Sequence, residues 1–166
     1  MPIRAIHRRV ANIALQAAGR YGVALAGGNA LLAHQIIDRY TDDVDLFVPQ
    51  EGTGFRAAAR RRGGRAAAGW LRLAIDDVIA SKVGALVTRS EIRDYLDVAA
   101  ILDGRTAAEV IALARQLQPD LEDDEFAVAG DSLDRIDDLA FARYGPNMAA
   151  WVRSRFTDWP RTGLAG

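Results

Sequence analysis

The sequence predicts an α+β protein in which a small mixed sheet is flanked by helices and followed by a helical C-terminal part. Two short apolar segments, residues 23–26 and 44–48, bracket a Gly-Gly pair and are typical of buried strands. Apolar residues spaced three and four apart, before and after these segments, predict helices. The chain has 166 residues, half of them apolar, which is about the size of one domain. We expect one compact unit, with a core at residues 1–105 and a helical extension at residues 106–166 packed on it.

The first part of the chain predicts the order helix, strand, Gly-Gly, helix, strand. Residues 4–20 follow the spacing of an amphipathic helix, whose apolar side consists of Ile6, Val10, Ile13 and Ala17. After the strand at 23–26, Asn29 is a plausible N-cap for a helix that continues over residues 30–37. Residues 44–48 then predict a buried strand, which Pro49 ends.

The rest of the chain is mainly helical in pattern. Residues 55–62 predict a short helix, and residues 70–75 alternate weakly, as a third strand would. Asp76 and Asp77 can cap the helix that follows them. Residues 122–125 predict a solvated turn or a helix start. The predicted helices lie at about 77–88, 90–102, 106–117, 131–143 and 147–156.

Charge is distributed unevenly along the chain. Residues 1–82 carry 12 basic and 7 acidic side chains, a net of +5, whereas residues 83–166 carry 9 basic and 15 acidic ones, a net of −6. Such asymmetry is typical of a face that binds polyanions, and ordinary surface charge is the open alternative. The chain has no Cys, which excludes disulfides and thiolate metal sites. We see no signal peptide and no apolar run of about 20 residues, so we expect a cytoplasmic protein with no membrane partner.

Asp43 and Asp45 are the most informative residues of the chain. They flank Val44 in an apolar segment, and alternation along a strand places both carboxylates on one face of a sheet. Two carboxylates held so close repel each other unless a cation lies between them. Proteins hold Mg²⁺ against nucleotide phosphates in this way, so the pattern predicts an enzyme that acts on a nucleoside triphosphate. An ion pair, for instance with Arg39, is the open alternative.

Gly27 and Gly28 lie between the first predicted strand and a helix. Because they have no side chains, phosphate oxygens could reach the backbone N–H groups at this turn. A Gly pair by itself more often marks a plain strand–helix turn, which is the alternative. The glycine pair therefore indicates a phosphate site only in combination with the carboxylates that follow it.

Lys82 is the only lysine among the 21 basic residues. An ammonium group differs from a guanidinium in size and hydration, so a single lysine indicates a place where the compact charge matters. We interpret it as a contact to triphosphate oxygens. A solvent-facing side chain beside the apolar face of its helix is the alternative.

Arg93, Asp94 and Asp97 lie on one predicted helix, which is otherwise largely apolar. Asp94 and Asp97 share a face, as do Arg93 and Asp97. A surface ion pair would explain this pattern and would contribute only a few tenths of a kcal/mol. If the acidic segment is buried, it needs a partner such as Lys82, a metal or a bound nucleotide.

A dense basic patch precedes the third predicted strand. Arginines bind phosphate backbones without reading sequence, so the patch is a candidate for RNA contact, with a solvated helix face as the alternative. The patch consists of Arg56, Arg60, Arg61, Arg62 and Arg65.

Three separated segments together resemble the AbiEii/AbiGii-type nucleotidyltransferase family: GGNALLAH…RYTDDVDLFV, IDDVIASKVGAL and RSEIRDYLDVAAIL. The family includes toxins of AbiE-like and MenAT-like toxin–antitoxin systems and belongs to the polymerase-β-like nucleotidyltransferase superfamily. The resemblance covers roughly residues 20–103, and its specificity lies in the order of the three motifs. It implies a nucleotidyltransferase core at residues 1–105.

The resemblance also implies a role for each matching residue. Asp43 and Asp45 correspond to the metal carboxylates, and Asp97, with Asp94 as a competitor, to the acidic residue of the fourth motif. The implied phosphate and nucleotide contacts are Gly27, Gly28, Asn29, Thr41 and Lys82. The implied cofactor is Mg²⁺, with an NTP as co-substrate.

Two features depart from the family pattern. The first motif often reads Gly-Ser, whereas here it reads Gly-Gly-Asn, so a hydroxyl contact is lost. Superfamily enzymes often carry a third carboxylate on a later strand, and residues 70–75 contain none. Asp76, Asp77 or Asp97 could take its place.

Together these observations predict a Mg²⁺-dependent nucleotidyltransferase toxin. It would transfer NMP to an RNA acceptor, the tRNA 3′ end first among them, which blocks aminoacylation and translation, and a cognate antitoxin would be its partner. Transfer to a small molecule or a protein hydroxyl is one alternative. A degenerate nucleotide-binding module without catalysis is another.

Overall fold

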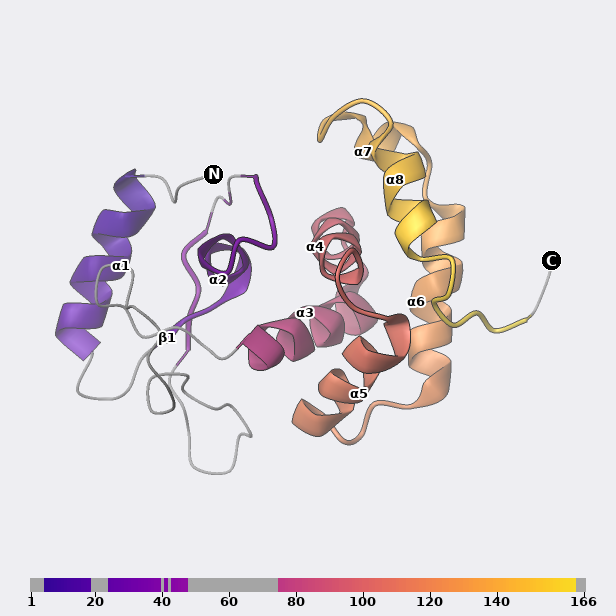
Figure 1. Ribbon diagram of the computed structural model, residues 1–166, viewed down its shortest axis with the longest axis horizontal. Coiled ribbons are helices and arrows are strands. Elements are labelled where there is room, and N and C mark those ends of the chain that lie inside the picture. The colour runs from indigo at the N-terminus through magenta and orange to yellow at the C-terminus, as the bar shows by residue number, and fades with distance from the viewer. Residues whose placement is uncertain (1–4, 19–23, 40, 42, 48–74, 164–166) are drawn as a thin grey trace. The chain divides into compact units, whose positions relative to one another are not determined.

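The computed structural model describes residues 5–18, 24–39, 41, 43–47 and 75–163 (Figure 1). These residues are mostly helical and include a small two-stranded antiparallel sheet, which confirms the predicted α+β class in its coarse form. The chain divides into two compact units, Met1–Val78 and Ile79–Gly166, which we describe separately. The predicted core at residues 1–105 would combine all of unit 1 with the beginning of unit 2, and this grouping stays a prediction.

The described residues of unit 1 form two complete helices, two strands of two residues each and the start of a third helix. The helices are α1 (Ala5–Ala18) and α2 (Gly27–Ala33), and the strands are β1 (Ala24–Leu25) and β2 (Leu46–Phe47). The two strands pair antiparallel, with Ala24 opposite Phe47, because the chain reverses direction after α2. The sheet was predicted to be mixed, but no parallel pairing occurs among the described residues. The predicted helix at 55–62 and residues 70–74 of the predicted third strand lie outside them, and Ile75 begins a helix.

Helix α1 exposes the apolar side chains that an amphipathic helix usually buries. Ile6 is 60% exposed, Val10 44% and Ile13 59%, while Ala11, on another side of the helix, is buried. Alanine permits a close approach of the backbone to its neighbours, which bulkier side chains would prevent. The helix itself is confirmed, but the spacing of its large apolar residues does not mark its buried side.

Unit 2 is helical throughout its described part. Its helices are α3 (Ile75–Arg89, which starts in unit 1), α4 (Ile92–Leu102), α5 (Ala107–Leu117), α6 (Asp123–Arg135), α7 (Leu139–Ala142) and α8 (Met148–Arg155). Four of the five helix predictions are confirmed, but the one at 131–143 is wrong, since the chain forms α6 and α7 there. Glu122 and Glu125 form a capping box at the start of α6. Of the two interpretations of residues 122–125, the helix start is therefore the right one. Asp76 and Asp77 lie in the first turn of α3 and do not precede it.

Aromatic side chains form the core of unit 2. Tyr95 of α4 packs on Phe156, which packs in turn on Trp159, with ring centroids 5.8 and 5.0 Å apart. The Tyr95 hydroxyl donates a hydrogen bond to the Ala129 carbonyl, and Trp159 Nε1 donates one to the Phe126 carbonyl. Burial raises the pKa of Tyr95, so the hydroxyl stays a donor. The side-chain polar atoms of Tyr95 and Trp159 therefore both have partners within unit 2.

The segment after α8 lies along α6. A Cβ at Gly130 would overlap the Pro160 carbonyl, so only glycine allows this approach. Arg161 pairs with Asp134, and this hydrogen-bonded ion pair lowers the pKa of Asp134. None of the described helices combines the length and the apolar composition that crossing a membrane requires.

Candidate functional site

The two glycines between β1 and α2 lie directly against the segment that carries the carboxylates. Gly27 has a φ of +60°, a left-handed conformation that favours glycine. A Cβ there would overlap the carboxylate of Asp45, and a Cβ at Gly28 would overlap the side chain of Thr41. The structure therefore gives the glycine pair a role within the protein: they let residues 41–45 approach the turn.

Asn29 completes this contact, although not as the predicted N-cap. The N-cap of α2 is Ala26, and Asn29 lies inside the helix, where it is 1% exposed. Its side-chain Nδ2 donates a hydrogen bond of 2.5 Å to the backbone carbonyl of Asp43. The same carbonyl lies 3.4 Å from Thr41 Oγ1. Three consecutive residues, Gly27 to Asn29, thus each contact the segment of residues 41–45.

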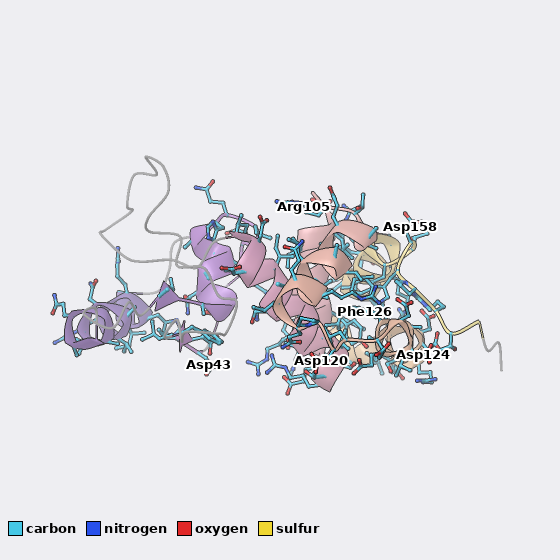
Figure 2. All side chains as sticks on the ribbon, turned by 90° about the horizontal axis from the view of Figure 1, so that it is seen from below. Asp43, Arg105, Asp120, Asp124, Phe126 and Asp158 are labelled. Atoms are coloured by element: carbon cyan, nitrogen blue, oxygen red, sulfur yellow. The ribbon has the colours of Figure 1, made fainter. Side chains whose placement is uncertain are left out.

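Asp43 and Asp45 lie just before β2, and both are exposed. Figure 2 labels Asp43. We expected them inside a mostly buried strand, where their charges would need compensation, but Leu46 and Phe47 are only half-buried. The position of Asp45 is fixed by its backbone, because its carbonyl accepts a hydrogen bond of 2.9 Å from the Ala26 amide. The two carboxylates are accessible to a ligand from solvent, and burial does not force a cation on them.

This pair of carboxylates suits Mg²⁺ shared with a triphosphate. Mg²⁺ takes hard oxygen ligands and is commonly held by one or two carboxylates, with substrate phosphates and water completing its shell. Among the residues that the structure describes, no group of three or more acidic or histidine side chains could hold a metal by itself. Asp43 and Asp45 alone would therefore offer two of the oxygen ligands that such an ion takes.

In unit 2, Lys82 of α3 pairs with Asp97 of α4. Lys82 Nζ lies 2.9 Å from Asp97 Oδ2, and the two side chains are 13% and 2% exposed. Lys82 is therefore not the solvent-facing residue that its helical position allowed. A nearly buried ammonium group is held in a fixed place by a buried carboxylate, which joins the two helices.

Asp94 forms an ion pair with Arg89, a residue that was not among the predicted site residues. Its carboxylate is fully buried and accepts two hydrogen bonds from Arg89, at 2.7 and 2.8 Å. Arg93 lies 3.5 Å from Glu91 in an exposed ion pair. Asp94 thus links the end of α3 to the start of α4, which leaves Asp97 as the acidic residue paired with Lys82. An arginine in the last turn of one helix, five residues before an aspartate in the next, was the available signal.

The basic patch lies outside the described residues, so Arg56, Arg60, Arg61, Arg62 and Arg65 are known from the sequence alone. Comparison with known proteins finds no matching family model, no matching curated protein and no matching solved structure. The structure describes two groups of predicted site residues, one in each unit. The first contains Gly27, Gly28, Asn29, Thr41, Asp43 and Asp45, and the second contains Lys82, Arg93, Asp94 and Asp97.

Proposed function

We propose that the chain is a Mg²⁺-dependent nucleotidyltransferase that transfers NMP from an NTP to an RNA acceptor. The observation that supports this most is the contact between the glycine pair and the carboxylate segment in unit 1. Gly27 adjoins the carboxylate of Asp45, and both carboxylates are exposed there. Asp45 and Thr41 fill the space that the missing side chains leave, so a triphosphate would bind to the backbone of this turn, beside two hard ligands for its metal.

In the proposed reaction, Asp43 and Asp45 would hold Mg²⁺. When bound, the ion would offset negative charge on the triphosphate oxygens. The backbone at Gly27 and Gly28 would bind phosphate oxygens. On the resemblance of the three motifs alone, Lys82 of unit 2 is a further candidate for such a contact. Thr41 and Asn29 support Asp43 through its backbone carbonyl.

Asp97 would act through Lys82 in this proposal. A carboxylate that is 2% exposed and 2.9 Å from the ammonium is well suited to orient it and poorly placed to take a proton from a large substrate. An RNA 3′-hydroxyl would attack the α-phosphorus, so that one P–O bond forms as the bond to pyrophosphate breaks. The hydroxyl proton would leave to solvent.

The choice of RNA as acceptor rests on the sequence. Residues 56–65 carry five arginines, and the first half of the chain has a net charge of +5. Such density favours a polyanion over a neutral small molecule. We propose the tRNA 3′ end as the acceptor, and a toxin–antitoxin system as the setting, on the resemblance of the three motifs.

The test is transfer of label from each α-³²P-labelled NTP to total RNA in the presence of Mg²⁺. We expect labelled RNA of tRNA size, and EDTA should abolish it. Asp43→Asn and Asp45→Asn should each reduce the rate about a hundredfold or more, because each removes a ligand of the charge-compensating ion.

Asp120→Asn is the matched control, since Asp120 is an exposed carboxylate of unit 2 (Figure 2). Its transfer rate should equal that of the wild type. Label on protein or on a small molecule would replace RNA as the acceptor. NTP binding without pyrophosphate release would contradict the proposed catalysis.

A further inference from the structure

Asn29 is a buried polar residue whose two amide atoms have different surroundings. Its Nδ2 donates to the Asp43 carbonyl at 2.5 Å. A peptide carbonyl can only accept a hydrogen bond, so the nitrogen must face it, and this settles the orientation of the amide. The oxygen, Oδ1, is buried and has no hydrogen-bond partner among the described residues.

Packing does not explain an amide at this position. A buried acceptor left without a donor destabilises the folded state. Leucine has nearly the same shape and would avoid this cost. What distinguishes Asn29 from leucine is the hydrogen bond from its nitrogen, and the acceptor of that bond is the backbone of Asp43.

The neighbours of Asn29 hold the same segment. A Cβ at Gly27 would overlap Asp45, and a Cβ at Gly28 would overlap Thr41. Those two contacts are steric and limit how far the segment can approach. The Asn29 hydrogen bond is directional, and among the described contacts it is the one by which a side chain of α2 holds the Asp43 carbonyl. The Ala26 amide holds the Asp45 carbonyl in the same way, and Thr41 lies within its own segment. The Asn29 amide therefore helps to set where the backbone of Asp43 lies along the turn.

From these contacts we infer that Asn29 is a positioning residue, which sets the Asp43 carboxylate for divalent-cation binding through the Asp43 backbone. The inference rests on the proposed function, because it assumes that Asp43 is a Mg²⁺ ligand. Residues that orient a ligand typically change metal affinity by about 10- to 100-fold when they are replaced. Loss of the Asn29 amide should therefore weaken metal binding without removing a ligand.

The test is calorimetric titration of Mg²⁺ into the full chain, saturated in turn with the non-transferable α,β-methylene analogue of each NTP. We expect Asn29→Leu to weaken Mg²⁺ binding by about tenfold or more. Asn29→Ser keeps a hydroxyl donor on a shorter side chain, so its Mg²⁺ affinity should lie between those of the wild type and Asn29→Leu. The Mg²⁺ concentration that gives half-maximal nucleotide transfer should shift in the same order.

Leu31→Ala is the matched control, because Leu31 is a fully buried residue of the same helix that does not carry a polar group. It should lower stability yet leave the Mg²⁺ affinity of the folded protein unchanged. If the Leu31 and Asn29 variants shift the affinity equally, or if neither Asn29 variant shifts it, Asn29 has only a structural role. If the wild type itself binds neither Mg²⁺ nor any analogue, the proposed function fails as well.

Discussion

At the scale of single residues, the glycine pair between β1 and α2 has two explanations: space for a phosphate, or space for side chains of the protein itself. The sequence suggests that missing side chains make room for phosphate. In the structure, the space beside Gly27 is taken by the Asp45 carboxylate and the space beside Gly28 by Thr41. The glycines are required by the protein itself, and any phosphate contact would use their backbone.

Replacement of Gly27 by alanine should test this requirement. Gly27→Ala forces a Cβ into a left-handed conformation and against Asp45, so we expect a loss of about 2–4 kcal/mol in the free energy of unfolding. Urea denaturation measures this loss. Gly104→Ala is the control, because a Cβ at Gly104 meets no atom within 4 Å and should change stability by less than about 1 kcal/mol. Equal effects at the two positions would contradict the close approach of Asp45.

At the scale of elements, α3 and α4 are joined by two ion pairs of different kinds. Arg89 is half-exposed and forms an ion pair with Asp94 at the turn between the helices. Lys82 and Asp97 form an ion pair in which both side chains are nearly buried. A buried pair rarely adds stability over an apolar pair of the same volume, but it is costly to break from one side. Because an apolar pair would serve stability as well, the presence of a charged pair here is consistent with a functional role for Lys82.

We expect Lys82→Met to lower the free energy of unfolding by about 3–5 kcal/mol, because it leaves Asp97 buried without its ammonium partner. The double variant Lys82→Met/Asp97→Leu should regain most of that stability in urea denaturation. If the proposed function holds, it should not regain nucleotide transfer, because the ammonium group is still missing. Recovery of transfer in the double variant would show that Lys82 acts only through stability.

The exposed pair of Arg93 and Glu91 provides the control for this comparison. Both side chains are more than 40% exposed, so Arg93→Met should change stability by less than about 1 kcal/mol. A loss as large as that of Lys82→Met would mean that charge number, and not burial, determines the effect.

Element prediction located most of the helices from their local spacing, although it misplaced α6, and it did not identify the side on which α1 is buried. The spacing of apolar residues located α1, but the side of α1 that is buried depends on what packs against it, and small Ala11 is buried while Ile13 is exposed. The pairing of Lys82 with Asp97 was among the interpretations that the sequence allowed. The pairing of Asp94 with Arg89 was not among those interpretations. Their five-residue spacing is visible in the sequence, but the turn at Ser90 that brings them together, with a φ of +50°, is not.

At the scale of the whole molecule, the candidate site residues are divided between two units. The division falls between Val78 and Ile79, inside α3. Unit 1 carries the glycine pair and the carboxylates, and unit 2 carries Lys82 and Asp97. The sequence could not predict this division, since the motifs run continuously across it.

Unit 2 should fold without unit 1. Its aromatic core is built from its own helices, and the buried polar atoms of Tyr95 and Trp159 bond to carbonyls within it. A fragment of residues 75–166, which keeps α3 whole, should therefore unfold cooperatively in urea when followed by tryptophan fluorescence. The buried Trp159, packed on Phe156, should report the transition.

The same fragment separates folding from function. It retains Lys82 and Asp97 but lacks Asp43 and Asp45, so it should fold and yet transfer no nucleotide. Gly130→Ala within the fragment should lower its urea midpoint, because the new Cβ would overlap the Pro160 carbonyl. A broad transition without cooperativity would mean that unit 2 needs residues before 75 for its stability. Nucleotide transfer by the fragment would place the catalytic carboxylates elsewhere in the chain.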